Sequence, residues 1–309
     1  MRFFRIIAAG VAAAALLTIC PYALSQNLPP IVNDKQVQTV QNIPIWGYIE
    51  QYDPNGDPVI LSVVKEAEKG MVILYGATFV YRPYTDEMGA DSFTVTAADD
   101  KQTHSRDAQI TVEIGENKQG EGFSDMRLNP SHYSALMLAQ NKIVSGESIG
   151  GTRLFRPNEE ISRTGFMLML LAASGSDTEL APCVSVDVSN DSDIALWLKP
   201  YVHRARQKGL IDAGEFLGDE SILRSEAIEL VCRAAGIEDV RAQPVHILDV
   251  ADIPADCLQS YLNLSARDML CLYDGYARPL APLTRAAAAD LVWQLCRYRQ
   301  ANDALVSQR

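Results

Sequence analysis

The pattern of apolar and polar positions divides the chain into two parts of different texture. Between residues 27 and 115, short runs of β-branched and aromatic residues alternate with polar ones, most clearly over residues 108–114. Turn-forming clusters such as residues 53–58 separate these runs. Alternation with a period of two predicts strands. Several short strands at this spacing predict an all-β sandwich over residues 27–115.

After this region the pattern becomes helical. Residues 116–122 are polar, contain glycine and have no periodicity, which is typical of a linker. Beyond them, apolar positions recur at helical spacing, first over residues 134–142 and then over residues 164–173. The predicted fold is therefore multi-domain, with an all-β sandwich followed by an all-α region.

The helical region repeats internally three times. Nine-residue stretches that end at Arg163, Arg224 and Arg285 align without gaps, and an apolar helix is expected after each arginine. A second landmark, formed by Asp125, Asp187 and Asp249, recurs every 62 residues. A unit of this size cannot bury its apolar face alone, whereas several packed together can. We therefore predict three units, at residues 123–180, 181–242 and 243–309.

The repeated arginine is expected at the first position of a helix. Ser162 and Thr284 are suitable N-caps, and Glu226 keeps the acidic half of a capping box in the second unit. A cation at this end opposes the helix dipole at a cost of about 0.3–1 kcal/mol. A guanidinium beside free N–H groups can bind a carboxylate. The alternative is a structural arginine that bridges neighbouring units.

These motifs resemble a known family. Residues 123–125, 143–146 and 155–163 resemble an S-layer homology repeat, for which three consecutive copies are usual. The resemblance implies a pseudo-threefold bundle that binds secondary cell-wall polysaccharide, often pyruvylated, or modified peptidoglycan. It also implies that the glycan contacts are Arg163, Arg224, Arg285 and Gly146.

The order of motifs within residues 29–114 resembles bacterial cadherin-like or Ig-like domains, which implies a spacer or adhesion module. Related domains sometimes bind calcium. Asp53, Asn55 and Asp57 offer oxygen ligands at alternate positions, and Asp99 could approach them in space. The alternative is a turn with solvated acids, and we expect no other cofactor.

The N-terminus predicts export. Arg2 and Arg5 precede an apolar run at residues 6–19, and small residues follow, so residues 1–25 are expected to be a signal peptide cleaved after Ser25. No later segment is apolar enough to span a membrane. Five cysteines follow the signal peptide without CxxC spacing. An extracellular location would permit one or two disulfides between them.

Composition narrows the function. The formal net charge is −12 and the isoelectric point is near 4.8, which argues against nucleic acid as a partner. The chain contains no GxSxG, HExxH or P-loop motif, so we expect a protein that is not an enzyme. The predicted function is a secreted surface protein anchored to the cell wall. Two alternatives remain: helical repeats that bind a protein or form part of the envelope without binding glycan, and an accessory subunit of a secreted hydrolase.

Overall fold

The structure is a computed structural model that describes residues 26–118, 120, 122–241, 247–273 and 275–307. The expected signal peptide, residues 1–25, lies outside the described residues. Among the helices that the structure describes, we find none that is both long and apolar enough to cross a membrane.

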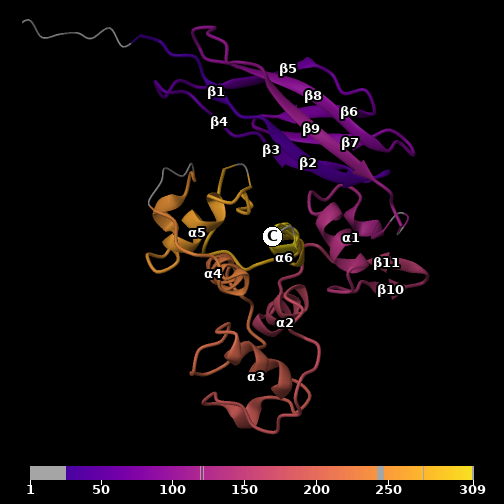
Figure 1. The fold of residues 1–309 in the computed structure, drawn as a ribbon, viewed down its shortest axis with the longest axis vertical. Helices are drawn as coiled ribbons and strands as arrows, with labels where there is room; N and C mark the ends of the chain where they lie inside the picture. The colour runs from indigo at the N-terminus through magenta and orange to yellow at the C-terminus, as the bar shows by residue number, and fades with distance from the viewer. Residues whose placement is uncertain (1–25, 119, 121, 242–246, 274, 308–309) are drawn as a thin grey trace, which may run out of the picture.

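The N-terminal part is a β-sandwich (Figure 1). One sheet has four strands in the order β2-β9-β8-β5, and the other has three in the order β3-β7-β6. Strand β2 pairs with β9 in parallel, and the other pairs in both sheets are antiparallel. The bounds are β1 Ile31–Val32, β2 Lys35–Val40, β3 Ile45–Tyr48, β4 Gln51–Tyr52, β5 Ile60–Lys65, β6 Gly70–Tyr75, β7 Thr78–Pro83, β8 Gly89–Ala98 and β9 Ala108–Gly115.

The predicted alternation places the core of the sandwich. In β9 every second residue from Ala108 to Ile114 is buried, because successive side chains point to opposite faces of a sheet. Phe79 of one sheet packs edge-on against Phe93 of the other, with ring centroids 5.2 Å apart. A Cβ atom at Gly47 would lie 2.3 Å from the Phe79 ring, so this position requires glycine.

The C-terminal part is helical, as predicted. Its α-helices occur in three successive pairs, α1 with α2, α3 with α4, and α5 with α6. The long helix α6 packs against α1, α2 and α4 at the centre of this part (Figure 1). The bounds are η1 Ser124–Met126, α1 His132–Gln140, β10 Glu147–Ile149, β11 Thr152–Leu154, α2 Arg163–Ala173, η2 Asp191–Asp193, α3 Lys199–Gln207, α4 Arg224–Ala235, η3 Val250–Asp252, α5 Leu258–Ser265 and α6 Arg285–Ser307.

The three helix pairs are joined by a closed ring of backbone hydrogen bonds. Ile161 N donates to Leu283 O (2.9 Å), Leu283 N donates to Ile222 O (2.8 Å), and Ile222 N donates to Ile161 O (3.1 Å). Two further sets of backbone hydrogen bonds run in the opposite cyclic order. In one of these sets, Arg163 N donates to Glu220 O, Arg224 N donates to Ala281 O, and Arg285 N donates to Glu159 O. Each segment therefore donates hydrogen bonds to both of its neighbours and accepts hydrogen bonds from both.

A turn in each unit is fixed by one polar side chain. The Asp125 carboxylate accepts hydrogen bonds from Phe155 N (2.8 Å) and Arg156 N (2.7 Å), and Asp249 does the same for Ala277 N and Arg278 N. In the second unit this role falls to Asn190, whose Oδ1 accepts from Phe216 N at 2.9 Å.

The predicted equivalence of Asp187 with these residues is therefore wrong. Asp187 pairs instead with Arg206, at 2.9 Å on the surface. The segment before η2 is longer than its counterparts, so the fixed spacing of 62 residues selected the wrong residue.

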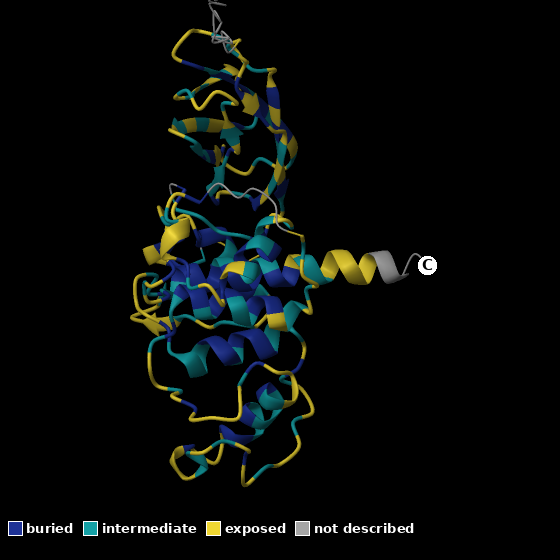
Figure 2. Ribbon diagram, turned by 90° about the vertical axis from the view of Figure 1, so that its left-hand side faces the viewer, coloured by how far each residue is buried: buried dark blue, intermediate teal, exposed yellow. Residues whose placement is uncertain are grey.

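The two parts of the chain share a contact surface. Val40 and Ile43 of the sandwich are buried with the core of the helical part, and Lys35 forms an ion pair with Asp268 (3.4 Å). Strands β2 and β3 face the helices at this junction (Figure 1). Figure 2 shows buried residues concentrated in the middle of the molecule, and residues 301–304 of α6 are exposed.

Candidate functional site

The three repeated arginines begin α2, α4 and α6, as predicted, and each reaches into the next unit of the ring. Arg285 Nε donates to Phe155 O at 2.9 Å, and Arg224 Nε donates to Ala277 O at 2.8 Å. Phe155 and Ala277 occupy equivalent positions in their units, so these two contacts are the same contact repeated. Each guanidinium also lies over an aromatic ring, 4.9 Å from the Phe155 centroid and 4.8 Å from the Tyr273 centroid.

Arg163 departs from this pattern. The carbonyl equivalent to those above, Phe216 O, already accepts a hydrogen bond from Asn190 Nδ2 at 3.1 Å. Arg163 instead forms ion pairs with Glu220 (2.9 Å) and Glu226 (2.6 Å) of the second unit. Its side chain is 26% exposed, and Glu220 is 59% exposed. Arg163 therefore has one partner that solvent or a ligand can displace.

A cavity of about 340 Å³ lies beside Arg163, between the first and second units. Apolar side chains such as Met167, Phe216 and Leu230 form part of its lining. The charged lining residues are Arg163, Asp212, Glu215, Glu226, Glu229 and Arg233. Four acids and two bases give a formal charge of −2, so the cavity is mildly acidic around its two guanidinium groups.

Two of the other predicted glycan contacts, Arg224 and Gly146, have structural roles. Arg224 is buried, with 5% of its surface exposed, and Arg224 Nη2 also donates to Cys271 O at 3.2 Å. A Cβ atom at Gly146 would lie 2.4 Å from the Phe123 ring and 2.7 Å from Leu154 O. Glycine is therefore required there by close packing. Among the predicted contacts, only Arg163 lines this cavity.

The helix starts explain why the arginines take these positions. Ser162 Oγ accepts from Gly165 N (3.1 Å) and Thr284 Oγ1 accepts from Ala287 N (3.3 Å), which are N-cap hydrogen bonds. In the second unit, Leu223 N donates to Glu226 Oε2 at 2.9 Å. The three helices thus begin at the predicted residue, although each uses only part of the capping box.

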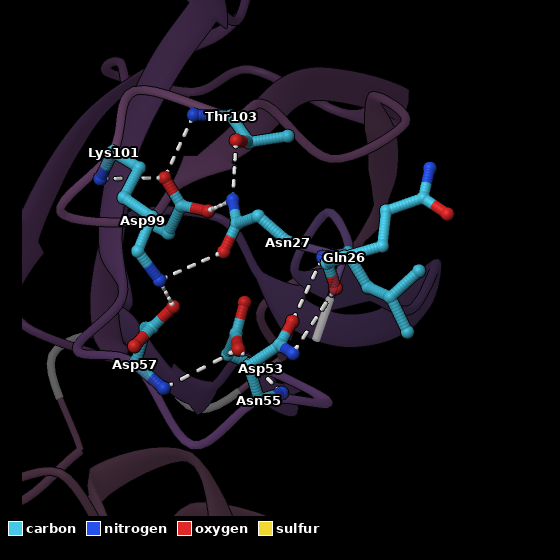
Figure 3. Close-up of polar contacts among 9 residues, drawn as sticks. Gln26, Asn27, Asp53, Asn55, Asp57, Asp99, Lys101 and Thr103 are labelled. Carbon is cyan, nitrogen blue, oxygen red and sulfur yellow. Dashed lines mark hydrogen bonds and ion pairs between the residues drawn. The ribbon is translucent and has the colours of Figure 1, made fainter. Parts of the chain in front are cut away.

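Figure 3 shows the predicted calcium ligands Asp53, Asn55, Asp57 and Asp99 in the sandwich. Carboxylate oxygens of Asp53, Asp57 and Asp99 all lie within 4.8 Å of one another. Asn55 does not join them, because its Oδ1 accepts from Leu28 N at 2.8 Å and its amide faces Gln26 O. The structure therefore brings together three of the four predicted ligands.

A lysine that sequence reasoning missed completes this acidic cluster. Lys101 Nζ donates to Asp57 Oδ2 and to Asn27 Oδ1 (Figure 3). The hydrogen bond to Asp57 raises the pKa of Lys101, which keeps the ammonium protonated. Burial raises the pKa of Asp99, but hydrogen bonds from Asn27, Thr103 and Lys101 outweigh it and lower that pKa overall.

The cluster has the chemistry of a site for a hard cation. Three ionised carboxylates and one ammonium leave a formal charge of −2. Asp53 Oδ2 is buried, and no residue in the described part of the chain donates a hydrogen bond to it. Calcium prefers six to eight oxygen ligands, so Asp53, Asp57 and Asp99 fit as the protein part of such a site.

The cysteines in the described part of the chain are all free thiols, so the disulfides that the sequence permitted are absent there. Burial raises the pKa of Cys232, Cys257 and Cys296 to about 11, and that of Cys271 to about 12. Thiols with such pKa values are poor nucleophiles at neutral pH. We therefore assign them to packing and not to chemistry.

Comparison with known proteins identifies the first part of the chain. Residues 27–113 match the bacterial Ig domain family, so the β-sandwich is a bacterial Ig-like domain, as predicted. The helical part does not fall within that match. A search of curated proteins found no match.

Solved structures resemble only small parts of the chain. An endo-fucoidan hydrolase of glycoside hydrolase family 107 is 15% identical, with 30% of this chain and 15% of that chain covered and a TM-score of 0.24. A SusE-like surface-located polysaccharide-binding protein of Bacteroides thetaiotaomicron is 18% identical (29% and 16% covered, TM-score 0.22). The D00-D0 domain of intimin is 11% identical (29% and 49% covered, TM-score 0.23). The assignment of the sandwich therefore depends on the family match.

Proposed function

We propose that this is an exported, noncatalytic protein whose three helical units are S-layer homology repeats that hold it on a cell-wall glycan. The observation that carries the proposal is the position of Arg163. It begins a helix, points across a boundary between units, lines a cavity and retains an exposed partner in Glu220. The Ig-like domain would then be a spacer or adhesion module displayed away from the wall.

The arrangement around Arg163 suggests how a glycan would bind. A carboxylate on the sugar, such as a pyruvate ketal, can replace Glu220 on Nη1, since that ion pair is exposed and contributes little. Glu226 would keep hold of Nη2 and fix the guanidinium. Because the cavity carries a formal charge of −2, it favours a polymer with isolated acidic groups over a densely anionic one.

Arg224 and Arg285 take a different role in this proposal. Both donate to backbone carbonyls of the next unit, so they hold the ring together and do not need to contact the glycan. One functional groove, between the first and second units, is sufficient for a specific anchor.

The test is a pull-down of the chain from Gln26 onward on purified cell-wall sacculi of the host, before and after the attached polymer is stripped. We expect binding to intact walls, loss of binding on stripping, and at least tenfold weaker binding for Arg163→Ala. The matched control is Arg156→Ala, because Arg156 is also paired with two surface glutamates but lies outside the cavity. An unchanged affinity of Arg163→Ala would move the glycan site elsewhere.

A second candidate function is protein binding by the helical part. The observation in its favour is the exposure of Leu196 (65%) and Trp197 (64%), which directly precede α3 in the sequence. An apolar pair of this kind suits a protein partner. Under this alternative, the chain would not bind sacculi, and Trp197→Ala would abolish the interaction with the partner.

We also propose a calcium ion held by Asp53, Asp57 and Asp99 in the Ig-like domain. The buried, unpartnered Asp53 Oδ2 is the observation that supports it. The Lys101 ammonium competes with the ion for Asp57, so calcium binding would require this side chain to move.

A further inference from the structure

A second cavity, also of about 340 Å³, lies at the junction between the Ig-like domain and the helical part. Its walls come from both sides. Strands β2 and β3 contribute residues such as Gln36, Gln38 and Trp46, and helices α1 and α6 contribute Tyr133 and Trp293. Figure 1 shows these strands facing these helices. This cavity is separate from the Arg163 cavity and shares no lining residue with it.

Aromatic side chains dominate the apolar part of the lining. The chain has three tryptophans, and two of them, Trp46 and Trp293, line this cavity. Trp46 is held in place by Tyr75, which stacks on it with a centroid distance of 6.1 Å and an interplanar angle of 12°. Tyr133 packs edge-on against Trp293, at 6.1 Å. Rigid aromatic rings that combine an apolar face with a polar edge suit flat, partly apolar ligands that also carry polar groups.

The polar part of the lining is rich in groups that bind hydroxyls. Asp290 on α6 accepts hydrogen bonds from Ser131 Oγ (2.6 Å) and from the Tyr273 hydroxyl (3.3 Å). Burial raises the pKa of Asp290. The side-chain amides of Gln36 and Gln38 lie on exposed positions of β2 and are available to a ligand.

The charges of the lining cancel. Lys35 and Arg297 are the bases, Asp268 and Asp290 are the acids, and Lys35 and Asp268 already pair with each other. An anion or a cation would therefore gain little there, whereas a neutral polyhydroxylated ligand could use the carboxyl, the amides and the rings together. Ligand pockets usually measure about 300–1,000 Å³. A cavity near the lower limit suits one or two sugar units.

We propose that this junction cavity binds a neutral sugar unit of a glycan chain, independently of the Arg163 cavity. Because both domains supply its walls, the bound sugar would contact the Ig-like domain and the helical part at once. It would thereby fix the orientation of one domain relative to the other. The Ig-like domain would then take part in glycan binding as well as acting as a spacer.

Tryptophan fluorescence gives a direct test. Trp197 lies outside the cavity, so in a Trp197→Phe variant of the chain from Gln26 onward both remaining tryptophans line it. The probes are a tetramer of N-acetylglucosamine, maltotetraose and, as a charged control, spermidine. We expect a saturable change in emission with at least one oligosaccharide and none with spermidine.

Variants locate the response. In the Trp197→Phe background, Gln38→Ala should weaken the oligosaccharide response at least fivefold without loss of fold, because Gln38 is exposed on β2. Arg163→Ala should leave the response unchanged, so failure of the anchoring proposal and failure of this one are distinguishable. The proposal is overturned if neither oligosaccharide gives a saturable change, if spermidine gives the stronger one, or if Gln38→Ala binds like the parent.

Discussion

Arg163 Nη2 lies 2.6 Å from Glu226 Oε1, and the other oxygen of the same carboxylate accepts the backbone N–H of Leu223 at the start of α4. One glutamate therefore caps a helix of the second unit and holds the arginine of the first. This pair holds the Arg163 guanidinium, which lacks the carbonyl partner that Arg224 and Arg285 have. The remaining guanidinium edge is paired with the exposed Glu220, where a ligand can compete.

The first prediction concerns this competition. Replacing Glu220 by glutamine removes a charged competitor for Arg163 Nη1. An exposed ion pair is worth about 0.2–1 kcal/mol, so we expect roughly 1.5- to 5-fold tighter binding of walls that carry acidic ketals. The measurement is the binding isotherm on sacculi. Glu147→Gln is the control, since Glu147 pairs with Arg156 away from the cavity. Weaker binding by Glu220→Gln would mean that Glu220 itself contacts the glycan.

The second prediction separates structural from ligand-binding arginines. Arg224→Met keeps side-chain length but leaves the carbonyls of Ala277 and Cys271 without their donor in a buried place. Hydrogen bonds from charged groups contribute about 1.5–3 kcal/mol each, so we expect the free energy of unfolding to fall by roughly 3 kcal/mol. Urea unfolding measures this free energy, with Arg156→Met as the control. Because Arg156 is exposed, its replacement should change the free energy of unfolding by less than about 1 kcal/mol.

A stable Arg224→Met variant that fails to bind walls would reverse this assignment. It would show that Arg224 contacts the glycan despite its burial, as the family resemblance implies. A variant that is destabilised but still binds walls below its unfolding transition would support the structural role.

Local patterns in the sequence were sufficient to predict the elements and the equivalence of the three arginines. The gapless alignment that ends at these arginines is confirmed by the ring of hydrogen bonds through Ile161, Ile222 and Leu283. The alternation over residues 108–114 likewise predicted the buried face of β9. Both signals are short-range and periodic, and such signals survive in a single sequence.

The partners of these residues could not be predicted in this way. Arg224 is buried because Tyr273 and two carbonyls of the third unit surround it, and this depends on contacts about 50 residues away. Lys101 reaches Asp57 across 44 residues of sequence. Asn190 could have been found, because Ile194 and Ile253 each follow four residues after their turn residue, Asn190 or Asp249. The constant spacing of the aspartates concealed that alignment.

The third prediction follows from this correction. Asn190→Ala removes both the acceptor for Phe216 N and the donor to Phe216 O, so a turn of the second unit loses its support. Each unpaired group costs about 1–3 kcal/mol where it is buried, and we expect a loss of about 2 kcal/mol in unfolding free energy. Asp187→Ala breaks an ion pair whose carboxylate is 87% exposed, and it should have almost no effect. Equal effects of the two variants would contradict the assignment of Asn190.

The fourth prediction tests the calcium proposal. Calcium that binds only the folded protein stabilises it by RT ln(1 + [L]/Kd), about 2.7 kcal/mol at a hundredfold excess over Kd. The melting temperature should therefore rise when calcium is added, and it should fall back to its original value when a chelator removes the calcium. Lys101→Gln removes the competing ammonium and should shift the calcium dependence to lower concentrations, whereas Asp53→Asn should abolish it. A melting temperature that is independent of calcium in both the parent and Lys101→Gln would exclude the ion.

The fifth prediction concerns acid stability of the Ig-like domain. Asp91 is buried, and burial by itself raises its pKa. Hydrogen bonds from the Tyr81 hydroxyl (2.7 Å) and from the N–H groups of Glu68 and Lys69 outweigh burial and lower the pKa below the usual value.

For a carboxyl whose folded-state pKa is lowered, the stabilisation is complete above the unfolded-state pKa of about 3.9 and is lost as pH falls through the folded-state value. We therefore expect Asp91→Asn to be less stable than the parent at pH 6, with the difference shrinking below about pH 4 as the parent loses this contribution. Urea unfolding at pH 6, 4 and 2.5 measures it, with the exposed Asp100→Asn as control. A difference that stays constant across this range would mean that the ionisation of Asp91 does not contribute to stability, and that the carboxyl acts through its shape and hydrogen bonds alone.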